Sequence, residues 1–264
     1  MEPIEIALEK AKIARQDNQV QEFRGSVSHA GSDIEYTQTR TVKVSKLALR
    51  ESRVISGFDN GPWVNQFRML RTRVLHSMDE QNWSTLAVTS AEEGVGKGLI
   101  ATNLAISLAM ELDSTVLLVD ANIQDPKIHK LFDFEPKYGL SDYLSGRHNL
   151  SELLFHPNIE RLVVLPAGEP LQNSTELLGS KKMEQLVREL KKRYPSRIVI
   201  FDLPPVLTQS DALAFSPYVD AALFVVEEGK SQMDSVKRAV SLLSKTKLLG
   251  VVVNKTQINR INYS

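Results

Sequence analysis

The sequence predicts an α/β protein built on a doubly wound, mostly parallel β-sheet, and three observations support this fold class. Short apolar runs alternate with helical patterns from residue 63 to residue 254. Each run is apolar almost throughout, which is typical of parallel strands covered on both faces. A glycine-rich turn, AEEGVGKG at residues 91–98, joins the first run to the helical pattern after it. In such folds ligands bind at the carboxyl ends of the strands.

The start of the chain has a different character. Residues 2–16 place Ile4, Leu8 and Ala11 at helical spacing, which predicts a short amphipathic helix. This helix could pack on its own domain or dock onto a partner, and the pattern favours neither. Residues 17–45 are polar and rich in Gln, Ser, Thr and Gly, as is typical of a linker.

The expected elements of the α/β domain follow in order. A helical pattern runs from Trp63 to His76. The predicted strands are Thr85–Ser90, Thr115–Asp120, Arg161–Pro166, Arg197–Asp202, Ala221–Val226 and Leu248–Asn254. The predicted helices lie near residues 98–111, 181–194, 210–217 and 231–245. We therefore expect an N-terminal helix and linker at 1–53, one domain at 54–256 and a short tail at 257–264.

Composition narrows the class of protein further. A chain of 264 residues can form one large domain with an appendage. Lys plus Arg and Asp plus Glu both number 32, so the formal net charge is zero and no nucleic-acid partner is indicated. The absence of cysteine excludes disulfides and thiolate metal sites. No apolar run approaches the roughly 20 residues that span a bilayer, so we expect a cytoplasmic protein without direct membrane insertion.

The turn between the first strand and its helix resembles a phosphate-binding loop. Gly94 and Gly96 allow the backbone to turn its N–H groups inward around phosphate oxygens, and the next helix adds its positive N-terminal end. Lys97 would reach the outer phosphates of a nucleotide. A glycine-rich turn that binds no ligand is the alternative. The last position, which normally carries a Ser or Thr hydroxyl for Mg²⁺, is Gly98 and offers no side-chain oxygen.

Two further strands end in acidic residues. VLLVD ends at Asp120 and IVIFD ends at Asp202. Acids at the ends of neighbouring parallel strands can converge on the metal and phosphates that the loop holds. Each acid alone could equally be a helix cap. Together with the loop, the pair favours a nucleotide site.

From about Trp63 to Thr256 the chain resembles the bacterial tyrosine kinases (BY-kinases) of exopolysaccharide and capsule systems, a branch of the MinD/ParA-type P-loop ATPases. The matching stretches occur in the family's order and are FRMLRTRV, LAVTSAEEGVGKG, VLLVDANIQDPKIHKLF, GLSDYLSG, LPAGEP, ELLGS, IVIFDLPPVLTQSDA and LGVVVNK. The N-terminal IEIALEKAKIARQ resembles the start of stand-alone cytoplasmic members associated with exosortases.

The resemblance implies roles for particular residues. Lys97, Asp120 and Asp202 match the catalytic positions, and both aspartates match metal positions. ATP or ADP is the implied cofactor. The implied nucleotide-binding residues are Gly94, Val95, Gly96, Lys97, Gly98, Leu99 and Asn254, of which Asn254 matches a contact to adenine. The implied partner is a membrane-embedded polysaccharide co-polymerase, or chain-length regulator, which would hold the protein at the inner membrane.

The chain differs from the family's pattern at positions that are implied to take part in the chemistry. Gly98 replaces Ser or Thr, and Asn122 replaces the second acid of an Asp-x-Asp motif, so Mg²⁺ binding is expected to be weakened. Gln124 and Asp125 replace a pair that is usually basic.

Positions that the resemblance links to assembly and to the phosphorylated substrate also differ from the family's pattern. Arg68 and Arg71 match a Glu-x-x-Arg-x-x-Arg motif used in ring assembly, which would make the chain a homo-oligomer. Asn65 stands where that motif has Glu, however. Tyr263 is the one tyrosine of a tail in which active members often carry a cluster.

Three functions therefore compete. The first is an ATP-dependent tyrosine autokinase of polysaccharide production with weak or lost activity, in which Tyr263 would be the acceptor. The second is a pseudokinase-type subunit that binds a chain-length regulator. The third is a MinD-like positioning ATPase, which is disfavoured because Glu92 occupies the place of the extra loop lysine and no basic amphipathic C-terminal helix is present. Whether the protein is an enzyme stays undecided at this point.

Overall fold

The structure, a computed structural model, describes residues 40–55, 62–111, 114–193 and 196–256. The predicted helix at 2–16 and the tail with Tyr263 lie outside these residues. No helix in the described part of the chain is long and apolar enough to cross a membrane.

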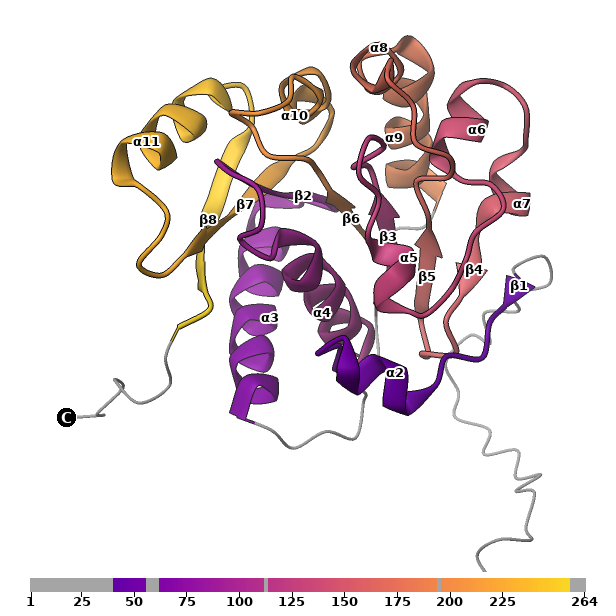
Figure 1. The fold of residues 1–264 in the computed structure, drawn as a ribbon, viewed down its shortest axis with the longest axis horizontal. Coiled ribbons are helices and arrows are strands. Elements are labelled where there is room, and N and C mark those ends of the chain that lie inside the picture. The colour runs from indigo at the N-terminus through magenta and orange to yellow at the C-terminus, as the bar shows by residue number, and fades with distance from the viewer. Residues whose placement is uncertain (1–39, 56–61, 112–113, 194–195, 257–264) are drawn as a thin grey trace, which may run out of the picture. The chain divides into compact units, whose positions relative to one another are not determined.

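The described residues form an eight-stranded sheet with helices around it (Figure 1). The strands are β1 (Arg40–Thr41), β2 (Thr85–Ser90), β3 (Thr115–Asp120), β4 (Phe155–His156), β5 (Leu162–Leu165), β6 (Arg197–Asp202), β7 (Ala221–Glu227) and β8 (Lys247–Asn254). Their spatial order is β1-β4-β5-β3-β6-β2-β7-β8. Neighbouring strands are parallel except for the antiparallel pair β4 and β5. The predicted fold class is confirmed.

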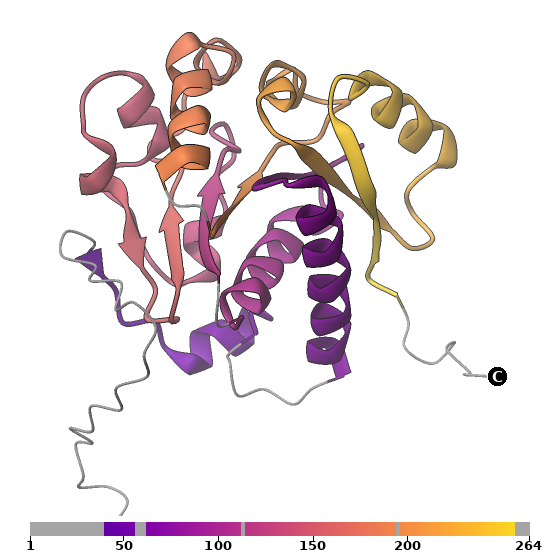
Figure 2. The same cartoon turned by 180° about the vertical axis from the view of Figure 1, so that it is seen from behind.

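The helices connect these strands. They are α2 (Lys46–Glu51), α3 (Pro62–Gln81), α4 (Lys97–Ala109), α5 (Ile128–Leu131), α6 (Leu140–Leu144), α7 (Leu150–Leu153), α8 (Ser174–Leu178), α9 (Lys181–Arg193), α10 (Asp211–Phe215) with the 3-10 turn η1 (Ser216–Tyr218), and α11 (Met233–Leu242). The helices α3 and α4 pack side by side against one face of the sheet (Figures 1 and 2). The predicted long helices match α3, α4, α9, α10 and α11, although α3 continues five residues beyond the expected end.

The central strands are buried on both faces, as the apolar runs predicted. All six residues of β2 and of β3 are buried. Ile200 of β6 belongs to the cluster that α4 covers. The next residue, Phe201, points to the opposite face and contacts Phe215 of α10, with 4.8 Å between the ring centroids. The carboxyl ends of these strands are thereby held rigidly at one edge.

The folded domain begins before residue 54, which is where we expected it to start. Arg40 and Thr41 pair with β4, and α2 begins at a cap in which Ser45 Oγ accepts a hydrogen bond from Leu47 N at 3.2 Å. Leu49 of α2 is buried. Asn103 of α4 donates to the carbonyl of residue 53 and accepts from the amide of residue 55. Residues 40–53, which we assigned to the N-terminal extension, therefore contribute a strand and a helix to the domain.

Candidate functional site

The phosphate loop joins β2 to α4 and has the backbone conformation that its glycines permit. Gly94 has φ +76° and Gly96 has φ +92°, a left-handed region that only glycine adopts at low cost. Gly96 precedes the first residue of α4, Lys97. Val95 is buried, so it anchors the loop between the two glycines. The N-terminus of α4 and its partial positive charge therefore face the edge where β2, β3 and β6 end.

Asp120 and Asp202 are brought together by the order of the strands. They are paired residues at the ends of the neighbouring strands β3 and β6. Both side chains are buried. Asp120 accepts hydrogen bonds from three backbone amides that follow it, those of Asn122, Lys127 and Ile128, at 3.2, 3.1 and 3.0 Å. The structure thus places both predicted acids beside each other, and Asp120 also organises the turn after its strand.

Residue 98 lies directly against Asp202. A Cβ atom added to Gly98 would be 3.0 Å from Asp202 Oδ2. This is closer than an ordinary van der Waals contact, so a side chain at residue 98 would need a small displacement of the carboxylate. The first turn of α4 and the end of β6 are therefore in contact where a nucleotide's outer phosphates and their metal would be expected.

The two carboxyl groups have raised pKa values. Burial raises the pKa of Asp120 to about 7, and the nearby Asp202 carboxylate adds to the rise. Burial also raises the pKa of Asp202 to about 6, while the ammonium groups of Lys97 and Lys127 oppose this. Two buried carboxyl groups with too little compensating positive charge form a site that favours a cation.

Oxygen atoms for a Mg²⁺ ion are present, but the set is incomplete. Asp202 Oδ1 and Asn122 Oδ1 are buried and accept no hydrogen bond from the described residues. The amide group of Asn122 is oriented by its bond to the Asp125 carbonyl at 2.9 Å. Asp120, Asp202 and the Asn122 oxygen could hold Mg²⁺, which would neutralise phosphate charge, whereas Gly98 supplies no ligand. In the part of the chain that the structure describes, no cluster of three or more His, Cys, Asp or Glu side chains could hold a metal.

The raised pKa of Asp202 predicts a pH-dependent stability. The folded-state pKa of about 6 exceeds the ordinary value of 3.8. The folded state therefore binds more protons, and its stability falls as pH rises from about 4 to about 7. Asp202→Asn should remove this loss. The free energy of unfolding of the variant minus that of the parent should therefore be larger at pH 8 than at pH 4.5 by on the order of 2 kcal/mol. Urea unfolding with chelator and without nucleotide measures this difference.

The exposed Asp79→Asn on α3 is the matched control, because it removes a carboxylate that solvent surrounds. If Asp202→Asn shifts stability equally at both pH values, the carboxyl group does not titrate in this range.

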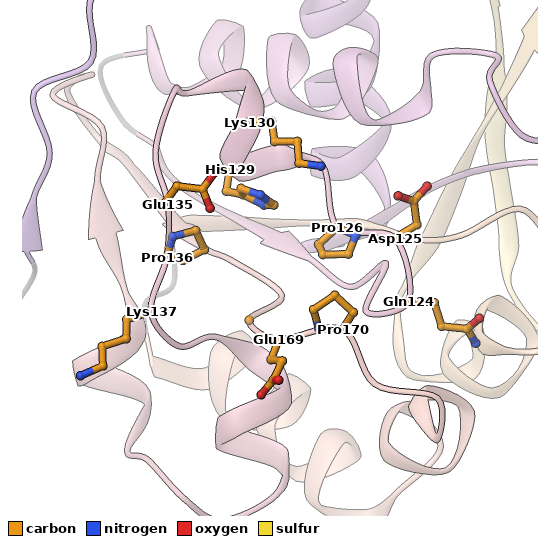
Figure 3. A pocket seen from close by; sticks show the side chains of 11 residues that line it. Gln124, Asp125, Pro126, His129, Lys130, Glu135, Pro136, Lys137, Glu169 and Pro170 are labelled. Carbon is orange, nitrogen blue, oxygen red and sulfur yellow. The ribbon is translucent and has the colours of Figure 1, made fainter.

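A pocket of about 440 Å³ lies between the chain that follows β3 and the chain that follows β5 (Figure 3). Gln124 and Asp125, the two positions where the resemblance implies a basic pair, both line it. The Gln124 side chain donates to Ser174 Oγ at 2.8 Å. His129 is buried, which lowers its pKa, and its Nδ1 atom has no hydrogen-bond partner among the described residues. We did not predict this pocket from the sequence, in which residues 124 and 125 stood out only as departures from the family's pattern.

Two more of the residues singled out in the sequence lie elsewhere in the structure. Arg71 of α3 forms an ion pair with Glu111 at 2.8 Å and donates to the Ser107 carbonyl at 3.1 Å. Its side chain is 19% exposed. Arg68 donates to Asn65 Oδ1 at 3.3 Å on the exposed face of α3. The guanidinium of Arg71 thus has partners within its own chain.

Asn254, at the end of β8, lies against the loop. Its side-chain amide donates to the Val95 carbonyl at 2.8 Å. A Cβ on Gly96 would be 2.3 Å from that amide nitrogen, so only glycine fits at residue 96. Gly98 lies against Asp202, and Asn122 and Asn254 contact Asp120 and the loop, so these predicted residues lie near the carboxyl ends of the strands.

The fold and this loop define a P-loop ATPase domain, and comparisons with known proteins agree. A family model described as an AAA domain matches residues 83–248. The chain is 32% identical to the tyrosine-protein kinase YwqD of Bacillus subtilis (strain 168), covering 74% of this chain and 82% of YwqD. The kinase domain of Escherichia coli tyrosine kinase ETK has a TM-score of 0.70 at 27% identity, covering 85% of this chain and 92% of that domain. The chain therefore belongs to the family of bacterial tyrosine-protein kinases.

A third relative is matched over only part of its length. The succinoglycan biosynthesis transport protein ExoP of Rhizobium meliloti (strain 1021) is 30% identical over 217 residues. These cover 80% of this chain and 27% of ExoP, so the similarity is to one part of that longer protein.

Proposed function

We propose that this protein binds an adenine nucleotide at the phosphate loop and acts in exopolysaccharide or capsule production as a tyrosine-kinase-like protein with weak or lost phosphoryl transfer. The observation that carries the proposal is the arrangement around residue 98. The loop, Lys97, Asp120 and Asp202 share one edge of the sheet, yet residue 98 adds no oxygen and Asn122 replaces a carboxylate.

The chain's own groups divide into binding and charge-stabilising roles. The backbone amides from Gly94 to Leu99 and the N-terminus of α4 would bind the phosphates. Lys97 is half-buried and would place its ammonium on the outer phosphates, where it stabilises charge that develops during transfer. Asp120 and Asp202 would hold the metal or, in Asp120, accept a proton from an incoming hydroxyl group. Asn254 would contact the adenine.

Titration of the purified protein with ATP and with ADP, with and without Mg²⁺, tests this proposal. We expect binding of both nucleotides, with a change in affinity of less than about tenfold on adding Mg²⁺, because residue 98 supplies no oxygen and Asn122 supplies a neutral amide oxygen in place of a carboxylate. A gain well above tenfold would show that the remaining oxygens form a full metal site. No detectable binding would remove the nucleotide from the proposal altogether.

The second candidate is an interaction subunit without kinase activity, and the state of Arg71 favours it. The resemblance links Arg71 to ring assembly, and its guanidinium is instead bound to Glu111 within the chain. In this case the protein would act by docking onto a membrane polysaccharide co-polymerase. Residues 2–16 and the polar stretch after them are suited to tethering such a partner.

Capture of detergent-solubilised membrane partners by the full chain and by a chain that starts at Gln38 tests the tether. The shorter chain keeps β1 and α2, whereas a start at Val54 would remove them. We expect weaker capture by the shorter chain. Equal capture would show that residues 1–37 do not contribute to docking.

A further inference from the structure

Two consecutive residues at the end of β8 hold two consecutive carbonyl groups of the phosphate loop. Asn254 Nδ2 donates to the Val95 carbonyl at 2.8 Å, and Lys255 Nζ donates to the Gly94 carbonyl at 2.7 Å. Residues 94 and 254 are far apart in the sequence, and β8 is the last strand at its edge of the sheet. The loop is therefore held from the side of β8 by side chains, in addition to its own glycine geometry.

These bonds determine which way the loop's amides point. In a trans peptide the C=O and the following N–H point in opposite directions. With the carbonyls of Gly94 and Val95 directed toward β8, the N–H groups of Val95 and Gly96 are directed away from β8, to the opposite side of the loop. Successive N–H groups on one side of a turn form an anion-binding concavity. The contacts from β8 thus favour the orientation that phosphates need.

The ammonium of Lys255 is itself held in place. Lys255 Nζ lies 2.9 Å from Glu227 Oε2, at the end of β7. Lys255 has φ +59°, a strained value for a side-chain-bearing residue, so the chain turns sharply here to direct the side chain back. A second ammonium, that of Lys230, shares the same carboxylate at 3.5 Å and lies 3.8 Å from the position of a Cβ on Gly94. Lys230 is thus equally charged and close to the loop, but no bond to a loop carbonyl holds it there.

We infer that Lys255 is a positioning residue for phosphate binding, which orients the loop through the Gly94 carbonyl without itself touching the nucleotide. Asn254 acts in the same way on the Val95 carbonyl, in addition to the adenine contact proposed for it. This inference rests on the nucleotide site proposed above. It predicts that the hydrogen bond from Lys255 to the loop supports phosphate binding, in addition to any effect of the positive charge of Lys255.

The test compares Lys255→Met, Lys255→Arg and Lys230→Met by calorimetric titration with ADP, inorganic tripolyphosphate and adenosine. Lys255→Met should weaken ADP and tripolyphosphate binding by about three- to tenfold, as expected for loss of a partly exposed charge-assisted hydrogen bond. Adenosine binding should stay unchanged, and Lys255→Arg should restore most of the loss. Lys230→Met removes the same charge from the same region and should weaken binding less.

Three outcomes would overturn the inference. Equal binding of ADP by Lys255→Met and the parent would show that the carbonyl contact has no effect on the loop. If Lys230→Met and Lys255→Met lose ADP affinity equally, the effect comes from positive charge near the loop and not from the hydrogen bond. If Lys255→Met loses affinity for adenosine and for ADP equally, the substitution acts by disturbing the fold.

Tripolyphosphate separates this inference from the proposed function. If the parent binds tripolyphosphate in a Lys255-dependent way but does not bind ADP, the loop is positioned as inferred and the nucleotide proposal fails. If the parent binds neither, both are overturned.

Discussion

Replacing Lys97 with alanine is expected to weaken ADP binding about a hundredfold, because charge-assisted hydrogen bonds to the outer phosphates are lost in a partly buried site. Lys97 begins α4 and is half-buried, so water replaces its ammonium only in part. Isothermal titration of the parent and the variant measures the difference. Lys237→Ala on α11 is the control, since it removes the charge of an exposed lysine.

Lys97 also influences the acid across the site. Its ammonium opposes the rise in the pKa of Asp202 that burial causes. Lys97→Ala should therefore raise the pKa of Asp202 further, and the pH range of falling stability should extend upward. A variant that loses neither affinity nor this coupling would show that Lys97 points away from the site in solution.

The second large effect is a gain of activity. Gly98→Ser combined with Asn122→Asp is expected to raise the rate of ATP hydrolysis by about tenfold or more, because a hydroxyl and a carboxylate are returned to the metal's surroundings. Asp202 Oδ2 lies 3.0 Å from the Cβ position at residue 98, so the new serine would sit directly beside a metal-directed acid. Steady-state phosphate release measures the rate, and anti-phosphotyrosine detection measures transfer to the tail.

The same variant carries a cost in stability. Asn122→Asp adds a third carboxyl group beside two buried ones and removes the donor to the Asp125 carbonyl. Unfolding without metal should therefore require about 1–3 kcal/mol less than for the parent, and Mg²⁺ with ATP should reverse the loss.

Gly98→Ala is the matched control for both measurements, since it adds the Cβ without an oxygen. If the double variant hydrolyses ATP no faster than the parent, or if Gly98→Ala accelerates it equally, the missing oxygens do not limit the reaction. Assembly would then be the step to examine, starting from the pairing of Arg71 with Glu111.

The long elements of this domain were predictable from the sequence because burial leaves a local signature. The strands Thr85–Ser90, Thr115–Asp120 and Arg197–Asp202 begin and end in the structure at the predicted residues. Each has an apolar centre and begins and ends at a polar or charged residue, so its boundaries are marked in the sequence. The glycines of the loop could likewise be assigned, because a turn between strand and helix in this motif requires positive φ values.

The short elements carried no such signature. The two-residue strands β1 and β4 are too short to show a period, and they form by pairing with neighbouring strands, β1 with β4 and β4 also with β5. The helix α2 has a single buried residue, Leu49, and its sequence therefore looked like the end of a polar linker. Residues 40–53 belong to the domain through the pairing of β1 with β4 and through the bond from Asn103 of α4 to the carbonyl of residue 53, and both contacts join residues far apart in the sequence.

By itself, the sequence determined the fold class, the phosphate loop and the identity of the two acids, because these depend on local spacing and residue type. Only the tertiary structure decided which of these groups meet. The pairing of Asp120 with Asp202 depends on β3 lying next to β6. The ion pair of Arg71 with Glu111 and the hydrogen bond from Lys255 to the Gly94 carbonyl likewise join segments that are distant in the sequence. Such contacts follow from strand order and helix packing, which no local pattern of residues encodes.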